Sequence, residues 1–247
     1  MNYRAYLIAH LPETLDLLRQ MVEINTFTYN AAGVTRLARF SAEAFAGLGL
    51  QAELVPSVNP QFGQHAFLSN HPLDWDGPSI ALISHLDTVF PPEEEAANDF
   101  HWRVDGDRIY GPGTNDIKGG TALIHLALSA LKALHPQQFE AVRWLVCLDA
   151  SEETLSDDFG RLCIERLPQE RTLACLVFEG GTPRGGTYPV VVARKGRAEF
   201  RVTASGRGAH AGNYHHQGAN AVVQMAHTIQ KIAGFTDYAN KITFTPG

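Results

Sequence analysis

The side chains best suited to chemistry in this sequence are carboxylates and one imidazole, each placed at the end of an aliphatic run. Four clusters have this character: His85 with Asp87, Asp116, the pair Glu152 and Glu153, and Glu179. Imidazole and carboxylate ligands in such numbers are typical of two divalent cations that share a bridging carboxylate and activate a water for hydrolysis. We therefore predict a metal-dependent hydrolytic centre.

His85 and Asp87 are two residues apart at the end of a predicted strand, so their side chains point to the same side. Asp87 can then accept the second ring N–H of a metal-bound His85, which fixes the tautomer and makes the ligand more basic. Taken alone, the pattern also fits a capping aspartate beside an ordinary histidine.

Asp116 is the one carboxylate in a segment, residues 111–120, that contains four glycines. Glycine permits tight turns and close approach of the backbone. The segment by itself also fits a turn in which Asp116 caps the following helix. The presence of the other clusters favours a carboxylate that bridges two metals.

Glu152 and Glu153 are adjacent and follow a predicted strand, where their charges repel each other unless a cation or a proton intervenes. Neighbouring side chains diverge, so one can bind metal while the other faces the catalytic water. The alternative is an ordinary pair of surface glutamates. Glu179, which also follows a predicted strand, is a weak signal by itself.

The placement of the clusters adds to their meaning, because ligands of open α/β sheets gather at the carboxyl ends of strands. We expect every cluster to follow a strand. One imidazole with several carboxylates suits zinc, with cobalt or manganese as neighbours, and argues against a thiolate site.

Hydrophobic periodicity predicts strands that alternate with helices. We expect helices over 12–26, 34–48 and 159–167, a loop leading into a helix over 116–134, and strands at 51–55, 66–68, 79–84, 142–148 and 173–178. This order predicts an α/β fold with a mostly parallel sheet flanked by helices.

Near residue 189 the sequence changes to segments in which apolar and polar residues alternate more clearly, which predicts a second module. Residues 190–192 and 198–203 are expected to form strands, 218–233 a helix, and 241–245 the start of a strand. We therefore divide the chain into a catalytic domain, residues 1–188, and a smaller domain, residues 189–247.

Composition narrows the class of protein. The chain has 247 residues, 45% hydrophobic and 19% charged, and a formal net charge of -6, so we expect a soluble globular protein that binds neither nucleic acid nor membranes. The three cysteines show no C-x-x-C spacing, which predicts neither a disulfide framework nor a zinc knot and favours a cytoplasmic location.

Five motifs together resemble a known family: H-L-D-T-V at 85–89, G-P-G-T-N-D-I-K-G-G at 111–120, S-E-E at 151–153, F-E-G at 178–180 and G-R-G-A-H-A-G at 206–212. They are similar to the co-catalytic zinc metallopeptidases and deacylases, which include glutamate carboxypeptidase, acetylornithine deacetylase, succinyl-diaminopimelate desuccinylase and aminoacylase. The glutamate carboxypeptidase-like branch is the most similar. The resemblance implies a phosphorylase/hydrolase-like catalytic domain and a smaller α+β dimerisation (lid) domain, present only in part.

The resemblance also implies a role for each residue of the clusters. Asp116 would bridge two zinc ions per subunit, His85 and Glu179 would complete one site, and Glu153 would belong to the other. Glu152 would be the general base, and Asp87 would orient His85 within the catalytic group. The implied substrates are small peptides or N-acyl amino acids, cleaved at an amide bond.

His210, in the fifth motif, would bind substrate from the dimerisation domain of the partner subunit, so the resemblance implies a homodimer. Relatives continue beyond this point and return a last histidine ligand to the catalytic domain. We therefore expect a C-terminally truncated chain. The alternative function is a non-catalytic metal-binding or dimerising fragment that lacks that ligand.

Overall fold

The computed structural model describes residues 2–181, 183 and 185–247. The chain forms two compact units, Met1–Thr182 and Pro183–Gly247. The assignment of a catalytic domain to 1–188 and a dimerisation domain to 189–247 stays a prediction.

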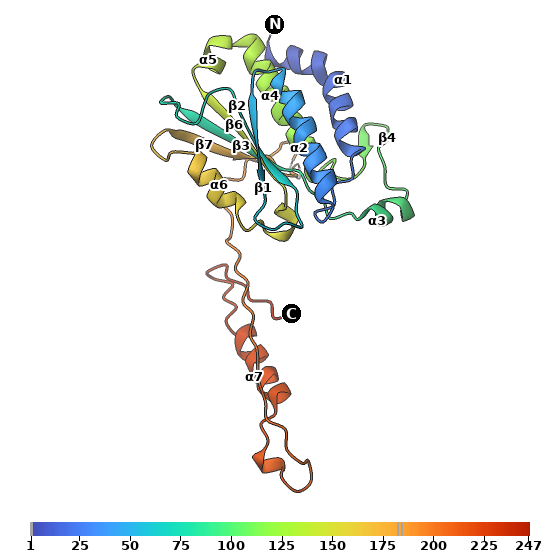
Figure 1. Cartoon of the computed structure of the whole chain (residues 1–247), viewed down its shortest axis with the longest axis vertical. Helices are drawn as coiled ribbons and strands as arrows, with labels where there is room; N and C mark the ends of the chain where they lie inside the picture. The colour runs from blue at the N-terminus through green and yellow to red at the C-terminus, as the bar shows by residue number, and fades with distance from the viewer. Residues whose placement is uncertain (1, 182, 184) are drawn as a thin grey trace. The chain divides into compact units, whose positions relative to one another are not determined.

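The first unit is built on a five-stranded sheet with the strand order β1-β2-β6-β3-β7 (Figure 1). The strands are β1 (Gln51–Pro56), β2 (Gln64–Ser69), β3 (Ser79–His85), β6 (Arg143–Asp149) and β7 (Thr172–Val177). Strand β3 pairs in parallel with both β6 and β7, whereas β1 with β2 and β2 with β6 are antiparallel. The sheet is therefore mixed, and its parallel part is the part that ends in the predicted ligands.

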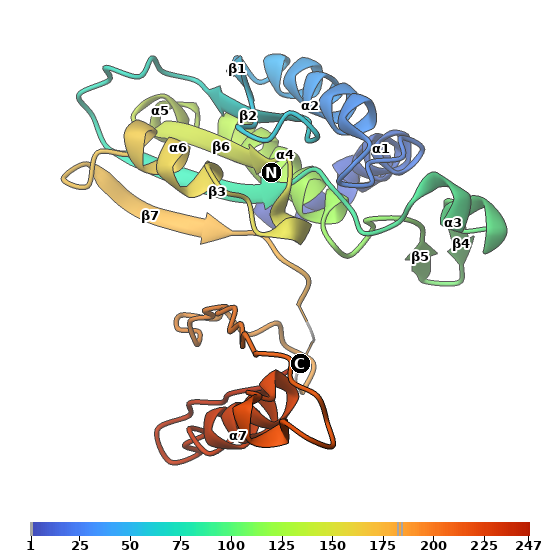
Figure 2. The same ribbon diagram turned by 60° about the horizontal axis from the view of Figure 1, so that its bottom comes forward.

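Helices cover both faces of this sheet, which confirms the α/β fold (Figures 1 and 2). The principal helices are α1 (Tyr3–Val22), α2 (Ala31–Ala46), α4 (Lys118–Leu134) and α6 (Phe159–Arg166). Alternate residues of β6 point to opposite faces. Val146 and Leu148 pack in the larger core under α1, α2 and α4, while Leu145 and Cys147 pack against α6.

Helix α1 begins earlier than the predicted start at Pro12. The Asn2 side chain accepts a hydrogen bond from the Ala5 backbone amide at 2.9 Å and caps the helix. Pro12 therefore lies inside the helix. Among the described helices, none combines the length and apolar character that a membrane crossing requires.

Four short elements of the first unit have no counterpart in the predicted set. They are α3 (Pro92–Ala97), β4 (Arg103–Asp105), β5 (Arg108–Tyr110) and α5 (Pro136–Glu140). Strands β4 and β5 form a separate antiparallel hairpin that lies beside α3 in both views (Figures 1 and 2). Three-residue strands are too short to produce a clear alternation in the sequence.

The second unit contains helix α7 (Ala221–Ala233), which confirms the helix predicted over 218–233. The strands predicted at 190–192 and 198–203 are wrong, since these described residues form no ladder. A strand requires a partner for its backbone hydrogen bonds, and Val192 is 92% exposed. The segment at 241–245 is limited to one isolated bridge, at Ile242.

Candidate metal centre

The carboxyl ends of three neighbouring strands bring most of the predicted ligands together. His85 is the last residue of β3, the short 3-10 helix Glu152–Thr154 follows β6, and Glu179 follows β7. Because β3 pairs in parallel with both β6 and β7, these ends lie at the same edge of the sheet. The structure thus has the arrangement in which α/β sheets commonly bind ligands.

Asp116 reaches the same place from a loop between β5 and α4, so the strand that it follows belongs to the two-stranded hairpin and not to the five-stranded sheet. The loop turns at Gly113, whose φ is +77° and where an added Cβ would lie 2.9 Å from Lys118 Cδ. Lys118 is buried and donates a hydrogen bond to the Ile24 carbonyl at 2.9 Å. These contacts hold the loop against the body of the unit.

Imidazole and carboxylate atoms converge at this point. His85 Nε2 lies 2.9 Å from Asp116 Oδ1, 3.8 Å from Glu179 Oε1 and 3.9 Å from Glu152 Oε2. One ligand atom each of His85, Asp116 and Glu153 lie within 4.8 Å of one another. A single divalent cation can contact all three, so the donor set fits zinc, cobalt or manganese.

Asp87 determines which nitrogen of His85 faces the cluster. His85 Nδ1 lies 3.1 Å from the Asp87 carbonyl oxygen and 3.3 Å from its Oδ1, and both atoms are acceptors. Nδ1 therefore carries a proton, and in the metal-free protein Nε2 also carries one, which faces the Asp116 carboxylate at 2.9 Å. A cation that displaced the Nε2 proton would meet the lone pair of this nitrogen. The tautomer that remains, with its proton on Nδ1, is the one that a metal ligand needs.

The Asp87 carboxylate also holds the glutamate pair in place. Buried and shielded from water, it accepts hydrogen bonds from the backbone amides of Glu152 at 3.1 Å and Glu153 at 3.2 Å. The Thr28 hydroxyl donates a third, at 2.8 Å. One buried carboxylate thus joins His85 to both neighbouring glutamates.

Replacing Asp87 with Ala is expected to destabilise the first unit by about 3 kcal/mol or more. The change leaves several donors without their acceptor, and each hydrogen bond to a charged group contributes about 1.5 to 3 kcal/mol. Urea unfolding of the metal-free protein measures the change. Asp74→Ala, at an exposed loop position, is the control. Equal stability of the two variants would contradict a joining role for Asp87.

The crowded charges shift the pKa values of the cluster. Burial lowers the pKa of His85, but the hydrogen bond and charge of Asp87, followed by Glu179 and Glu152, outweigh it and raise this pKa to about 9. Burial, followed by the charge of Asp116, raises the pKa of Glu153 to about 7 against the opposing charge of His85. In the metal-free protein, His85 and Glu153 therefore keep their protons to higher pH, and a bound divalent cation would displace these protons.

These raised pKa values predict that the metal-free protein loses stability as the pH increases. Glu153 has an ordinary pKa of 4.5 and a folded pKa of about 7, so its contribution is fully present below 4.5 and is lost as the pH rises through 7. Glu153→Gln should therefore gain in stability relative to the parent protein from pH 4.5 to 7.

Urea unfolding midpoints in the presence of a chelator test this expectation. Glu140→Gln, at an exposed position of α5, should follow the parent protein at every pH. A difference between Glu153→Gln and the parent that stays constant or shrinks with rising pH would contradict the electrostatic account of the cluster.

His210 lies in the second unit, where its local geometry is defined. Its Nδ1 accepts hydrogen bonds from the backbone amides of Gly212 at 3.2 Å and Asn213 at 3.1 Å. The ring proton is therefore on Nε2, which is free to donate. Its predicted role at the active site stays a prediction.

Three polar residues near the centre were missed in the sequence: Thr28, His65 and Asp158. Each is buried and contacts a partner that is more than fifty residues away along the chain. Local periodicity contains no information on such pairs. The one usable signal was Asp158, which directly precedes helix α6 as capping residues do.

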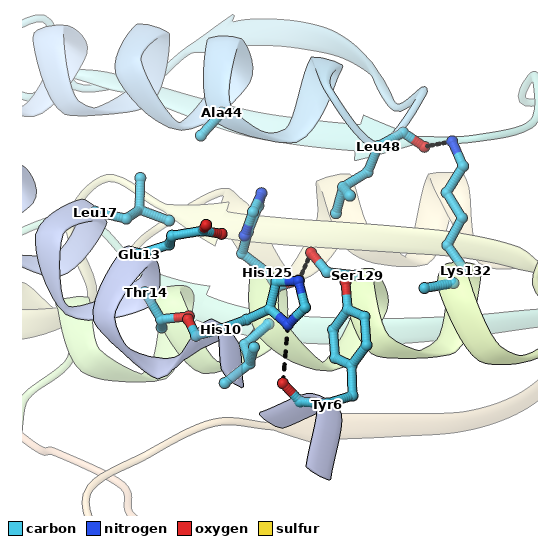
Figure 3. Close-up of a pocket in the computed structure, with 12 residues that line it drawn as sticks. Tyr6, His10, Glu13, Thr14, Leu17, Ala44, Leu48, His125, Ser129 and Lys132 are labelled. Carbon is cyan, nitrogen blue, oxygen red and sulfur yellow. Dashed lines mark hydrogen bonds between the residues drawn. The ribbon is translucent and has the colours of Figure 1, made fainter. Parts of the chain in front are cut away.

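A hollow on the first unit lies away from the cluster. A cavity of about 500 Å³ lies among α1, α2 and α4, lined in part by His10, Glu13, His125 and Lys132 (Figure 3). It includes none of the predicted ligands. Several of its polar groups are already bonded locally, for example Lys132 Nζ to the Leu48 carbonyl at 2.7 Å. The chemistry of this chain is therefore assigned to the carboxylate cluster.

Comparison with known proteins decides the family. The model of peptidase family M20/M25/M40 matches residues 81–243, which include every residue of the cluster. The chain belongs to peptidase family M20/M25/M40. This confirms the resemblance drawn from the five motifs.

Curated relatives of this M20-family chain include a carboxypeptidase and a desuccinylase. Carboxypeptidase G2 of Pseudomonas sp. (strain RS-16) is 28% identical over 233 residues, which are 94% of this chain and 54% of that protein. Succinyl-diaminopimelate desuccinylase of Halorhodospira halophila is 27% identical over 225 residues, 89% of this chain and 56% of that protein. The chain thus spans about half the length of these relatives.

Solved structures show the same fold. A tripeptidase from Staphylococcus aureus superposes with a TM-score of 0.56 at 20% identity, covering 89% of this chain and 56% of that one. Human carnosine dipeptidase 1 gives a TM-score of 0.56 at 18% identity, covering 71% of this chain and 40% of that one. The sheet and helices described above therefore have the same fold as the matched parts of these two proteins.

Proposed function

We propose that this chain carries the metal centre of an amide hydrolase that cleaves small peptides or N-acyl amino acids with a free carboxylate. The observation that carries the proposal is the convergence of His85, Asp116 and Glu153 within 4.8 Å at the carboxyl edge of the parallel strands. The names of the relatives, a carboxypeptidase and a desuccinylase, supply the substrate class.

In this proposal Asp116 bridges two zinc ions, His85 and Glu179 complete one site, and Glu153 contributes to the other. The Asp116 side chain is 60% exposed and lies beside the buried His85. Its carboxylate is therefore accessible to a second cation, which suits a bridging ligand. The bound cations would polarise the scissile carbonyl and lower the pKa of the attacking water.

Glu152 is the proposed general base. Its carboxylate is half exposed, and Oε2 faces the cluster at 3.9 Å from His85 Nε2. Burial raises its pKa, against the opposing charge of His85 and with the added charge of Asp87. A raised pKa makes a carboxylate a better proton acceptor near neutral pH. Glu152 would take the proton of the water and pass it to the leaving amine.

His210 is the proposed substrate-binding residue of a homodimer. Its two accepted amide hydrogen bonds fix the proton on Nε2. A fixed N–H donor of this kind can stabilise the oxyanion that develops on the scissile carbonyl. The proposal places this donor in the active site of the partner subunit.

Metal removal tests the proposed function. The zinc-loaded chain should hydrolyse an N-acyl glutamate or a dipeptide, lose that activity in a chelator, and recover it when zinc or cobalt is returned. The same substrate with its carboxylate converted to an amide should be cleaved more slowly. A metal-loaded chain that hydrolyses neither substrate would overturn the proposal and favour the non-catalytic alternative.

A further inference from the structure

A buried histidine outside the metal centre ties together the two ends of the loop that carries the glutamate pair. His65, the second residue of β2, has no exposed surface. Its Nε2 lies 3.1 Å from Asp158 Oδ1. Its Nδ1 lies 3.0 Å from the Ala150 backbone nitrogen and 3.2 Å from Asp149 Oδ1. Glu152 and Glu153 lie between these two anchoring points.

Both protonation states of the His65 ring make the same connection. When the ring is neutral, Nδ1 accepts from the Ala150 amide and Nε2–H donates to Asp158. When the ring is protonated, Nδ1–H donates to Asp149 while Nε2–H keeps its bond to Asp158. In each state the end of β6 and the start of α6 are held by one side chain.

The loop between these anchors contains a strained backbone conformation that other contacts must stabilise. Leu155, which is 54% exposed, has a φ of +61°, in the left-handed region that disfavours a leucine. Backbone strain of this kind persists only where the surrounding structure enforces it, and it gathers at functional sites. Inside the loop, the Thr154 hydroxyl donates to the Ser151 carbonyl at 3.1 Å.

The contacts lead from His65 towards the cluster in short steps. Asp149 Oδ1, beside the ring, accepts a hydrogen bond from the Ser151 amide at 3.0 Å. The next two amides, of Glu152 and Glu153, donate to Asp87. At the far end, Asp158 Oδ2 accepts from the amide of Val58 at 3.0 Å and fixes that anchor to a neighbouring loop.

We propose that His65 is a positioning residue that holds the Glu152–Glu153 turn in its metal-binding geometry through Asp149 and Asp158. The inference rests on the proposed function, because that function makes the Glu152–Glu153 turn part of a metal site. The contacts of His65 themselves exist without metal. His65 touches none of the four proposed ligands, so its effect on the site must pass through the loop. A histidine that only fills the core would leave the loop unaffected.

Amide hydrogen exchange in the metal-free protein separates these two roles. His65→Leu places an apolar side chain in the core and removes the contacts of the ring nitrogens with both anchors. We expect the amides of Glu152 and Glu153 to exchange about 10-fold faster or more in this variant than in the parent protein. This increase should exceed the increase at the other amides of the sheet. Leu162→Ala is the matched control, because it removes apolar packing from the core cluster at α6 while the backbone amide of residue 162 keeps its hydrogen bond to the Asp158 carbonyl.

A second readout is the affinity for cobalt, measured by titration of the same proteins. Loss of an outer positioning contact typically weakens metal binding by about 10-fold or more, and Leu162→Ala should retain the parent affinity. Exchange at Glu152 and Glu153 that is unchanged, or that increases equally in the control, would overturn the inference.

Two further outcomes are distinguishable. If the parent protein binds neither cobalt nor zinc, the proposed metal centre fails while amide exchange still decides the role of His65. If His65→Leu does not fold, His65→Gln is measured by the same criteria. The side-chain amide of glutamine can keep the contact with one anchor but not with both. Slower exchange of the Glu152 and Glu153 amides in His65→Gln than in the control would also overturn the inference.

Discussion

Replacing Glu152 with Gln is expected to lower kcat for amide hydrolysis by about 10²- to 10⁴-fold, the range that a general base contributes. Gln keeps the size of the side chain and the backbone amide that donates to Asp87, but it cannot accept the proton of the water. The metal content of the protein should be unchanged, because Glu152 is not among the proposed ligands.

Steady-state kinetics with an N-acyl amino acid, together with metal analysis of the same preparations, measure this effect. Glu170→Gln, at an exposed position after α6, is the control for the loss of one negative charge. A Glu152→Gln protein that retains the parent kcat would show that another group accepts the proton.

Replacing Asp116 with Ala is expected to weaken zinc binding by about 100-fold or more, since loss of even an outer contact of a metal ligand costs about 10- to 100-fold. Asp116 lies 2.9 Å from His85 Nε2 and is the proposed bridge, so its removal affects both metal positions. Because its side chain is 60% exposed, the fold should survive the change.

Titration of the metal-free protein with zinc measures this second effect, with urea unfolding as the check on stability. Asp107→Ala, in the exposed turn of the β4–β5 hairpin, is the matched control and should bind zinc as the parent does. Removal of Asp116 also removes a charge that raises the pKa of Glu153. Unchanged zinc affinity in Asp116→Ala would exclude a bridging role.

The sequence predicts the core of the first unit well because its strands are buried and its motifs are compact. Continuous apolar runs at 79–84 and 142–148 correspond to β3 and β6, which are covered on both faces. His85 is the last residue of β3, the pair Glu152 and Glu153 follows β6, and Glu179 follows the more exposed strand β7. Their proximity therefore follows from the parallel pairing of β3 with its two neighbours.

Other features could not be predicted because they depend on contacts that are distant in the sequence. Asp116 enters the site from a loop whose course is determined by Gly113 and by the buried Lys118. The antiparallel addition of β1 and β2 depends on pairing partners, which periodicity does not specify. The strands expected near residues 190 and 200 alternate in sequence, yet without a partner they form no ladder in the described chain.

The signal that is least visible in the sequence is the anchor around His65. Its partners Asp149 and Asp158 are ordinary acidic residues when each is seen alone, and only the fold brings both to one ring. Asp87 is similar, since its link to His85 is local but its link to the amide of Glu153 spans 66 residues. Functional positions that act through other residues are accordingly harder to predict than direct ligands.

The most direct test of the metal centre is anomalous X-ray diffraction at the zinc edge from crystals of the zinc-loaded chain. The account predicts anomalous density within about 2.0 to 2.2 Å of His85 Nε2 and of carboxylate oxygens of Asp116 and Glu179, the usual coordination distances of zinc. Zinc bound elsewhere, with no density beside His85 and Asp116, would contradict the account.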